Sequence, residues 1–492
     1  MQSCLSSYEA SCERKASVTP VPQAAVSQTE SALIAALGGD AVITAAGHLD
    51  EYTADTYWPA LHAKAAGAPI ARPDIVVRPR TEEDVATVLE IASSQGVPVV
   101  PWGGGSGTQG GALAIRGGIV IDLRSLDAVL DIDVVSMTVT VQAGKNGREL
   151  EAELNARGLM LPHYPASVEW ATVGGYIAAR GSGVLSTRYG KIEDLVLSLR
   201  VATPAGGLIE TVPAPRHAVG MELTQLFVGS EGTLGVITRA TLQLVPVPEA
   251  RRFAAVAFPD VPAGVSTIRR ALQLGHRPSV VRLYDEEATR LAFAPVVGED
   301  LSGVYTVLAF EGEAEAAALE ERRTLELARE AGAELLDPGL GRRWWDRRYD
   351  FYHPPHNPEL PAIWGTLDVV ATYDRIQAVY EALHTAVRVP YADTGLQLRM
   401  HFSHWYLWGT MIYGRFVVPD GGPDALALHD RIWEDGMTAA LDAGAVINDH
   451  HGVGLKLGPY MRRQHGAALD TMRQLKAALD PRGVMNPGKL GL

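Results

Sequence analysis

The chain has 492 residues, of which 47% are apolar and 20% charged, so we expect a water-soluble protein of two or more packed units. Its formal net charge of −14 argues against a nucleic-acid partner, because binding to phosphate backbones requires a basic surface. No segment reaches the roughly 18 uncharged apolar residues of a membrane span, and the N-terminus lacks the apolar core of a signal peptide. A cytoplasmic location is the default expectation.

The first residues are polar, and we expect residues 1–27 to form a disordered leader. Both cysteines of the chain, Cys4 and Cys12, fall in this leader. Neither a disulfide framework nor a catalytic thiol is therefore expected. A short helix is predicted from Thr29, ending at the glycine pair that begins with Gly38.

Residues 74–102 predict a βαβ unit, in which an amphipathic helix begins after Thr81 and the second strand leads directly into a glycine cluster. Within the cluster, residues 105–110 match G-x-G-x-x-G, the fingerprint of dinucleotide-binding Rossmann folds. That fold needs a helix directly after the glycines, to hold the pyrophosphate at its N-terminus. Only a few residues separate Gly111 from the next predicted strand, which is a loop length. The match therefore does not indicate a Rossmann site.

The glycine cluster has another explanation. Without Cβ atoms and with freedom to adopt positive φ, its successive backbone N–H groups could converge on an anion as a nest. A glycine-rich turn without a ligand is the alternative. Two more glycine-rich segments follow, residues 165–206 and 228–246, each beside a predicted strand. Three such segments in order favour a nucleotide site over turns alone.

From Arg251 to Val446, strands alternate with long helices, which predicts an α+β layer with helices on one face of a mostly antiparallel sheet. Tryptophan, tyrosine and histidine concentrate in this region, as they do in pocket walls, although aromatic-rich strands also occur in ordinary cores. The residues concerned are Trp344, Trp345, His353, His356, His401, His404, Trp405, Tyr406, Trp408 and Tyr413.

Five long motifs occur in order along the chain: PWGGGSGT, TVGGYIAARGSG, YGKIEDLVLSLRVATPAG, GSEGTLGVIT and LDPRGVMNPGKL. Together they resemble the FAD-linked oxidases, also called the vanillyl-alcohol oxidase or PCMH-type family, and are nearest to the alkyldihydroxyacetonephosphate synthase group. The resemblance extends from about Arg72 to the C-terminus. It implies an α+β fold: a PCMH-type FAD-binding domain of two α+β subdomains at residues 28–250, an α+β cap or substrate domain with a mostly antiparallel sheet at 251–446, and a C-terminal segment, 447–492, that returns to the FAD domain.

The resemblance also implies which residues bind FAD. Those of the first two glycine-rich segments would contact the pyrophosphate, and those of the third would complete the nucleotide cleft. The first loop has no histidine for covalent attachment, the matching position being Gly105, and only two cysteines exist, so noncovalent FAD is predicted. The implied residues are Gly103, Gly104, Gly105, Ser106, Gly107, Thr108, Ser167, Thr172, Gly175, Arg180, Ser182, Glu231, Gly232, Thr233, Leu234, Gly235 and Ile237.

A histidine pair is the candidate base. His450 and His451 precede Gly452 and Gly454, where a tight turn could expose an imidazole beside the flavin. Histidine titrates near neutrality, which suits proton removal from a hydroxyl or an activated C–H. Hydrogen bonds from both rings to turn carbonyls are the alternative. Tyr413 is the best-placed candidate to hydrogen-bond the reacting oxygen.

Two arginines are candidate substrate anchors. Arg282 and Arg375 lie in or beside predicted cap strands, where a guanidinium could bind a carboxylate or phosphate through two parallel hydrogen bonds; surface ion pairs are the alternative. No bound metal is expected, because the histidine and glutamate ligands of D-lactate- and glycolate-type relatives have no match here. His401 and His404 are three residues apart in a predicted strand, which would place them on opposite faces.

These features predict an FAD-dependent oxidoreductase, an oxidase or dehydrogenase, that transfers hydride from a C–H bearing an oxygen function to flavin N5 while a histidine takes the proton. The substrate would be an alcohol or a 2-hydroxy acid. The alternative is a redox-neutral alkyl transferase of the alkyldihydroxyacetonephosphate synthase type, with flavin N5 as nucleophile. That group typically has three consecutive histidines where this chain has Asp449, His450 and His451.

A flavin-binding scaffold without activity is a third, non-enzymatic hypothesis. The expected partner is a small-molecule substrate, with no nucleic acid and no stable membrane span. A homodimer is compatible with the sequence, which does not fix the oligomeric state.

Overall fold

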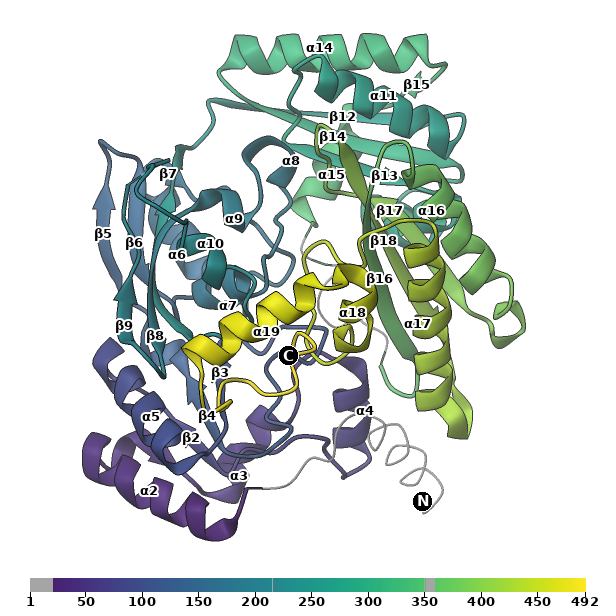
Figure 1. Ribbon diagram of the computed structural model, residues 1–492. Coiled ribbons are helices and arrows are strands. Elements are labelled where there is room, and N and C mark those ends of the chain that lie inside the picture. The colour runs from purple at the N-terminus through teal and green to yellow at the C-terminus, as the bar shows by residue number, and fades with distance from the viewer. Residues whose placement is uncertain (1–20, 215, 349, 351–358) are drawn as a thin grey trace.

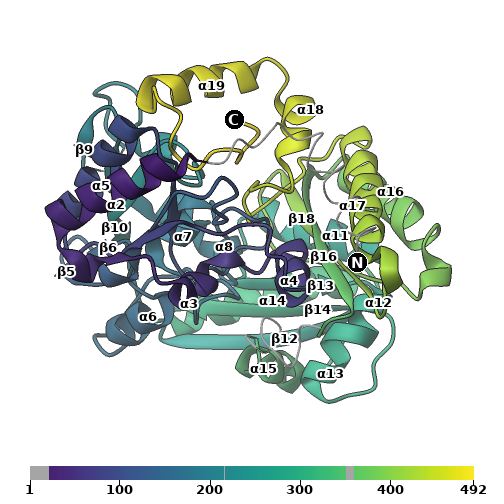
Figure 2. The same cartoon turned by 90° about the horizontal axis from the view of Figure 1, so that it is seen from below.

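The computed structural model describes residues 21–214, 216–348, 350 and 359–492 (Figure 1). The chain forms an N-terminal unit with a four-stranded and a five-stranded sheet, followed by a cap with a seven-stranded sheet. Figure 2 shows the N-terminal unit and the cap side by side, with the last helices above them. Cys4, Cys12, His353 and His356 lie outside the described residues.

The first sheet contains the predicted βαβ unit. Its strands are ordered β1, β2, β4, β3, and β4 pairs in parallel with both β2 and β3. A capping box between Thr81 and Asp84 begins α5, and Gly96 ends it. The loop 103–118 between β3 and β4 contains no helix, which confirms that the fingerprint match is not a Rossmann turn. The bounds are β1 (Val42–Ile43), β2 (Ile75–Val77), α5 (Glu82–Gln95), β3 (Val99–Trp102) and β4 (Ile119–Asp122).

The N-terminal helix is longer than predicted. It begins at Gln23, inside the predicted leader and before Thr29, and ends at Leu37. Val26 and Leu33 fall on one side of this helix, α2, and are buried in the core of the first sheet. This burial stabilises the helix, so its first turn is helical although its polar composition predicted disorder. Two short helices follow, α3 (Ala46–Leu49) and α4 (Trp58–Ala65).

The second sheet of the N-terminal unit is antiparallel and carries the other two glycine-rich segments. Its strands are ordered β5, β6, β10, β8, β9. The second glycine-rich segment contains α7, α8 and α9 before β8, and the third begins as a loop that leads into β10. The bounds are β5 (Val129–Asp133), β6 (Thr138–Gln142), α6 (Gly147–Asn155), α7 (Val173–Ala178), α8 (Ser186–Tyr189), α9 (Ile192–Leu195), β8 (Val196–Thr203), β9 (Gly207–Glu210), α10 (Thr224–Phe227) and β10 (Val236–Gln243). Two short strands, β7 (Leu159–Met160) and β11 (Val245–Pro246), pair with each other.

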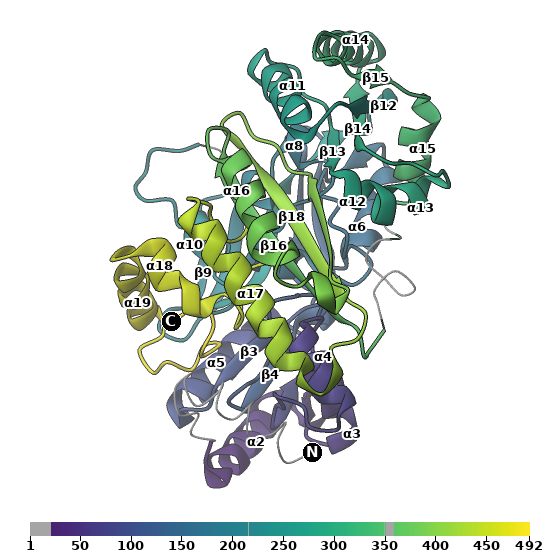
Figure 3. The ribbon, with the colours of Figure 1, turned by 90° about the vertical axis from the view of Figure 1, so that its right-hand side faces the viewer.

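The cap sheet is antiparallel throughout, as predicted, with its strands ordered β15, β12, β14, β13, β17, β18, β16. Residues alternate between its two faces. One face buries Leu283, Leu367 and Leu398 against α11, α14, α16 and α17; Figure 3 shows α16 and α17 in front of β16 and β18. The strand bounds are β12 (Ala250–Phe258), β13 (Val280–Tyr284), β14 (Val304–Gly312), β15 (Glu334–Leu335), β16 (Ile363–Thr372), β17 (Gln397–Phe402) and β18 (Gly409–Val418).

The opposite face of the cap sheet is turned toward the N-terminal unit. At one end it packs on Trp344 and Trp345 of α15. The sequence predicts that all cap helices lie on one face of the sheet, and α15 is an exception to that prediction. The helix bounds are α11 (Val261–Gln273), α12 (Glu286–Ala288), α13 (Ala294–Val297), α14 (Ala314–Glu330), α15 (Pro338–Asp346), α16 (Ile376–Leu383) and α17 (Ala425–Asp442). The rest of this face is free to line a cavity.

The last residues cross from the cap to the N-terminal unit through α18 (Met461–His465) and α19 (Ala468–Leu479). Met485 pairs in parallel with Val99 at the edge of β3. The ammonium of Lys476 donates to the carbonyl of Thr233, 2.9 Å away. Within the part of the chain that the structure describes, no helix is long and apolar enough to cross a membrane.

Candidate active site

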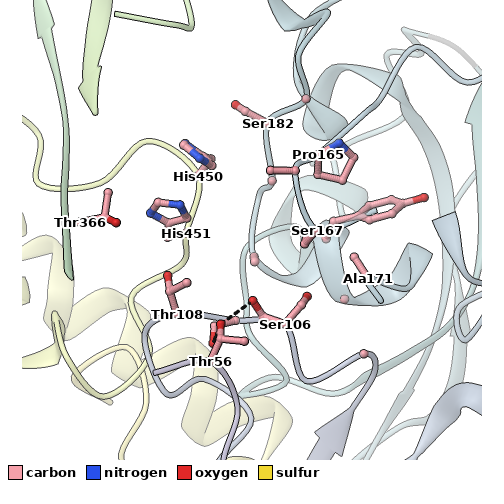
Figure 4. Close-up of a pocket in the computed structure, with 18 of the residues that line it drawn as sticks. Thr56, Ser106, Thr108, Pro165, Ser167, Ala171, Ser182, Thr366, His450 and His451 are labelled. Carbon is pink, nitrogen blue, oxygen red and sulfur yellow. Dashed lines mark hydrogen bonds between the residues drawn. The ribbon is translucent and has the colours of Figure 1, made fainter. Parts of the chain in front are cut away.

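A cavity of about 420 Å³ lies between the N-terminal unit and the cap sheet. Residues of all three glycine-rich segments line one side, and residues of β13, β16, β17 and β18 line the other. Figure 4 shows His450 and His451 on the side opposite Ser182 and Ser167, with Thr108 and Ser106 below them. The cavity thus brings together segments that are far apart in the sequence.

The first glycine loop offers free hydrogen-bond donors to this cavity. Among the described residues, no acceptor is found for the backbone N–H groups of Gly103, Gly104, Gly105 or Gly107. The hydroxyl of Thr108 is buried and also has no partner in this part of the chain. A Cβ atom on Gly104 would overlap the carbonyl oxygen of Trp170, because the loop lies directly on the second glycine-rich segment. The loop is therefore a nest of N–H groups suited to an anion such as pyrophosphate.

Most of the predicted FAD-binding residues line the cavity, namely Gly103, Gly104, Gly105, Ser106, Gly107, Thr108, Ser167, Thr172, Gly175, Ser182, Glu231, Gly232, Gly235 and Ile237. Three do not. Arg180 packs on Gly229 and donates to Glu193, 2.7 Å away. Thr233 turns its hydroxyl to the carbonyl of Ser230, and Leu234 is buried in the core of the second sheet. These three side chains contact other parts of the N-terminal unit and do not line the cavity.

Glu231, in the third glycine-rich segment, contacts the loop of residues 448–454, which contains His450 and His451 and is called the histidine loop. Its carboxyl group accepts hydrogen bonds from the backbone N–H groups of Val453 and Gly454. Burial raises the pKa of Glu231 to about 7. Gly452 and Gly454 have φ of 77° and 52°, and a Cβ atom on Gly454 would overlap the carbonyl oxygen of Gln109. Glycine is needed there for the histidine loop to approach the first glycine loop.

A row of side chains crosses four strands on the cavity face of the cap sheet. Tyr284 of β13 is opposite His401 of β17, His401 is opposite Tyr413 of β18, and Tyr413 is opposite Asp368 of β16. The rings of His401 and Tyr413 stack with centroids 4.8 Å apart. Because directly opposed residues share a face, the register alone aligns these groups.

Arginines surround this row. Arg399 and Arg415 form the neighbouring cross-strand pair, and Arg282 lies two residues from Tyr284 on the same face. Nη1 of Arg282 donates to Nε2 of His401, 2.9 Å away. Neither Arg282 nor Arg399 has an ion pair with an acidic side chain among the residues described. Burial lowers the pKa of Arg282, and burial together with Arg415 lowers the pKa of Arg399 to about 10.

The two predicted histidines lie in the cavity beside two buried carboxylates. Nδ1 of His450 is 3.0 Å from Oδ2 of Asp449 and 3.2 Å from Oδ2 of Asp368. Nδ1 of His451 is 3.1 Å from the same Asp368 oxygen, and burial lowers the pKa of His451. The ring of Tyr413 lies 6.0 Å from that of His450 and 5.5 Å from that of His451. The structure therefore brings His450, His451 and Tyr413 together.

Arg375 is not part of this group. Its side chain is 58% exposed at the start of α16, where it packs against Gly444 and lies 3.9 Å from Asp374. It is absent from the residues that line the cavity. This geometry does not support the prediction that Arg375 anchors the substrate, because the residue follows the end of β16 on the solvent side. The surface ion pair, the alternative considered for it, describes its environment.

The argument that separated His401 from His404 is also wrong. We predicted one continuous strand through both, but β17 ends at Phe402 and His404 lies in the turn that leads to β18. Both histidines consequently line the cavity. Nδ1 of His404 is 2.7 Å from the hydroxyl of Ser186, and its ring lies edge-on to that of His450 with centroids 5.0 Å apart.

Among the residues that the structure describes, two groups of side chains have a spacing that a metal ion could bridge. They are Asp368, His450 and His451, and His404, Asp449 and His450. Both groups contain His450, whose Nδ1 already contacts Asp368 and Asp449, and the ammonium of Lys191 lies 3.8 Å from Asp449. The expectation of no metal stays a prediction.

Sequence reasoning missed Arg399 and Arg415 as cavity residues, and Asp368 as a partner of the histidine pair. A signal for the first two was available, because residues 397–402 alternate polar and apolar side chains, which puts Arg399 and His401 on one face of a strand. Arg415 follows Tyr413 by two residues in the same way. For Asp368 no comparable signal exists, since it is one acid in an apolar strand.

The donor set fits FAD. The N–H nest of the first loop and the unpartnered hydroxyl of Thr108 suit the negatively charged pyrophosphate, and the cavity continues from them to the histidines and the cap sheet. In that arrangement the reactive ring system would lie between the second glycine-rich segment and the row containing Tyr413. The residues present thus match both ends of the cofactor.

Comparisons with known proteins agree. Residues 73–212 match the family "FAD binding domain", and residues 247–490 match "FAD linked oxidases, C-terminal domain". The chain is 30% identical over 449 residues to alkyldihydroxyacetonephosphate synthase of Trypanosoma brucei brucei, covering 85% of this chain and 73% of that one. It is 31% identical over 436 residues to D-lactate dehydrogenase [cytochrome], mitochondrial, of Arabidopsis thaliana, with the same coverage of 85% and 73%.

Solved structures show the same fold. A structure of alkyldihydroxyacetonephosphate synthase superposes with a TM-score of 0.79 at 25% identity, covering 97% of this chain and 87% of that one. A structure of p-cresol methylhydroxylase with substrate bound has a TM-score of 0.77 at 17% identity and covers 96% and 98%, which shows likeness of fold. FAD is the cofactor that these domains bind. The chain belongs to the FAD-linked oxidase family.

Proposed function

We propose that this protein is an FAD-dependent oxidoreductase that removes hydride from the hydroxyl-bearing carbon of an anionic small molecule, with a 2-hydroxy acid as the substrate class. One observation carries the proposal. The cavity contains two partly buried cationic arginines, Arg282 and Arg399, without an acidic ion-pair partner in the described chain, and the histidine His450 in the same space. A cation that is partly removed from water and has no protein counter-ion is costly, and a substrate anion would offset that cost.

The side chains have separate roles in this proposal. Bound FAD would supply the hydride acceptor. Arg282 and Arg399 would hold the substrate carboxylate through charge-assisted hydrogen bonds, and Tyr413 would hydrogen-bond the reacting oxygen. His450 would take the hydroxyl proton on Nε2, since its Nδ1 already faces Asp449. Noncovalent FAD, held by the glycine loops, is part of the proposal.

The relatives support two reactions. The similarity to D-lactate dehydrogenase favours oxidation of a 2-hydroxy acid. The similarity to alkyldihydroxyacetonephosphate synthase favours the alternative, a redox-neutral alkyl transfer. A second observation favours that alternative: Leu291, Ala292, Pro295 and Val296 line the cavity near α13, where an apolar chain could lie. We place oxidation first because the histidine triplet of the transferase group is interrupted by Asp449.

An anaerobic substrate screen tests the proposal. The holoprotein is mixed with D- and L-2-hydroxy acids, with neutral alcohols of the same length, and with an acyl-dihydroxyacetone phosphate. Oxidation predicts loss of the oxidised flavin absorbance with a hydroxy acid and not with its neutral analogue. Release of fatty acid from the acyl ketone phosphate, with the flavin still oxidised at the end, would support the transferase instead.

A further inference from the structure

We propose that Asp449 is a positioning residue that fixes the tautomer of His450, keeping the hydrogen on Nδ1 and leaving Nε2 bare to accept the substrate proton. The inference deepens the proposed function and rests on it for the identity of that proton. It concerns the position at which this chain departs from the three consecutive histidines of the group that it resembles. The aspartate at this position would then have a chemical role, which is to orient His450.

The contacts of His450 set its tautomer. Nδ1 of the ring is 3.0 Å from Oδ2 of Asp449 and 3.2 Å from Oδ2 of Asp368. Asp368 also accepts a hydrogen bond from the backbone N–H of His450, at 3.2 Å. An ionised carboxylate can only accept, so Nδ1 must be the donor. In the neutral ring, Nε2 then has no hydrogen and is the basic atom.

Asp449 is held as a carboxylate by its own partners. Its side chain is 2% exposed, and the hydroxyls of Tyr406 and Ser182 donate to it at 2.6 and 3.1 Å. The ammonium of Lys191 lies 3.8 Å away and donates to the backbone carbonyl of Asp449 at 2.5 Å. Burial opposes the charge, but Lys191, His450 and His404 together keep the pKa of Asp449 below its usual range.

These partners come from both sides of the cavity. Ser182 and Lys191 belong to the N-terminal unit, whereas Tyr406 belongs to the turn between β17 and β18 of the cap. Asp449 is therefore fixed from two directions, and its carboxylate cannot turn away from His450 without breaking several hydrogen bonds. A group fixed in this way can hold the imidazole in one orientation throughout the reaction.

The step balances. The O–H bond of the substrate would break and its proton would go to Nε2 of His450, while the hydrogen of the C–H bond would leave with its two electrons as hydride, for which bound FAD would be the acceptor. The carbon and oxygen of the substrate form a carbonyl. His450 becomes a cation at that moment, and Asp449, 3.0 Å from Nδ1, stabilises it without taking the proton.

The direct test is the tautomer of His450 in the holoprotein, measured by ¹⁵N NMR of histidine-labelled protein and assigned by the signal lost in His450→Gln. We expect a protonated Nδ1 and an unprotonated Nε2 in the neutral ring. A wild-type ring protonated on Nε2 would overturn the proposal, and this result needs neither a known substrate nor a stable variant at Asp449.

Variants then separate positioning from structure. Asp449→Asn, whose amide nitrogen can turn toward Nδ1, should shift the tautomer toward Nε2–H despite the Asp368 oxygen 3.2 Å away. It should lower kcat at least about 100-fold, with KM and bound FAD close to wild type. Asp449→His, which restores the three histidines, should also lose the activity. Asp430→Asn is the matched control, because Asp430 likewise contacts a histidine and a lysine, His429 and Lys456, but lies outside the cavity.

The outcomes are distinct. Full turnover in Asp449→Asn, or a KM change without a kcat change, would contradict the positioning role. An unchanged His450 tautomer in that variant would contradict it as well. Failure of the proposed function itself would instead appear as no flavin reduction by any hydroxy acid in wild-type protein with the expected tautomer.

Discussion

The guanidinium of Arg282 donates from Nη1 to Nε2 of His401, 2.9 Å away. Because arginine has donors and no acceptor, the histidine must accept, so its hydrogen is on Nδ1. Burial and the nearby Arg282 charge hold the pKa of His401 well below its usual range, which keeps the ring neutral. The neutral His401 ring, stacked on Tyr413, thus fixes the orientation of the partly buried Arg282 cation without cancelling its charge.

Loss of the Arg282 cation should weaken substrate binding. We expect Arg282→Met to raise KM for an acidic substrate by roughly 10- to 100-fold, the value of a charge-assisted hydrogen bond. Steady-state kinetics measure it. Arg375→Met is the control, and because that side chain is exposed and outside the cavity its KM should stay within about twofold of wild type. Equal effects of the two variants would contradict the assignment.

The first glycine loop should not tolerate a side chain at Gly104. A methyl group there would overlap the carbonyl oxygen of Trp170, so Gly104→Ala should displace the loop and yield protein with little bound FAD. The ratio of flavin to protein absorbance after purification reports the loss. Gly39→Ala, where a Cβ atom would meet nothing within 4 Å, should keep full FAD content.

FAD should be released on denaturation. The first glycine-rich loop is the place where an attachment histidine would lie, and it has glycine at position 105. Acid precipitation should therefore leave the yellow flavin in the supernatant and colourless protein in the pellet. Flavin that stays with the precipitated protein would show a covalent link and point to one of the cavity histidines.

Asp285 should make folding stability depend on pH. Burial raises the pKa of its carboxyl group to about 7, compared with about 3.9 in an unfolded chain. A raised pKa contributes stability that is present below the unfolded value and lost as the pH rises through the folded value. The free energy of unfolding should therefore fall between pH 5 and pH 8 by about 3 kcal/mol from this group.

Asp285→Asn should remove that dependence. The amide oxygen can still accept from the backbone N–H of Ala288 and so preserve the cap of α12. Urea unfolding at both pH values should show the variant gaining stability relative to wild type as the pH rises. A constant difference between the two proteins would mean that Asp285 titrates normally.

The local features of the fold could be predicted from the sequence because they depend on neighbouring residues. The capping signal at Thr81, the glycine density of residues 103–111 and the missing helix after it all involve short-range geometry. Each was found in the structure. The start of α2 was misplaced because burial of Val26 and Leu33, a tertiary effect, decides it.

The site could be predicted only in part. Arg282 and Arg375 look equivalent in the sequence, since each lies near a cap strand, and only the sheet topology shows that one faces the cavity and the other the solvent. His404 was misassigned because the turn of residues 403–408 is as aromatic as the strands beside it. The sequence shows Asp449 only as a departure from three consecutive histidines. Its contacts with Ser182, Lys191 and Tyr406 cannot be predicted from the sequence, because these residues lie up to 267 positions away.

The most direct test of the proposed function is the anaerobic reduction of the flavin by a 2-hydroxy acid carrying deuterium on the hydroxyl-bearing carbon, followed by stopped-flow absorbance. Hydride removal predicts complete bleaching by one equivalent of substrate, slower with the deuterated acid than with the ordinary one, and much slower in His450→Gln. A flavin that stays oxidised with every hydroxy acid, in protein that releases fatty acid from acyl-dihydroxyacetone phosphate, would contradict oxidation and establish the alkyl transferase.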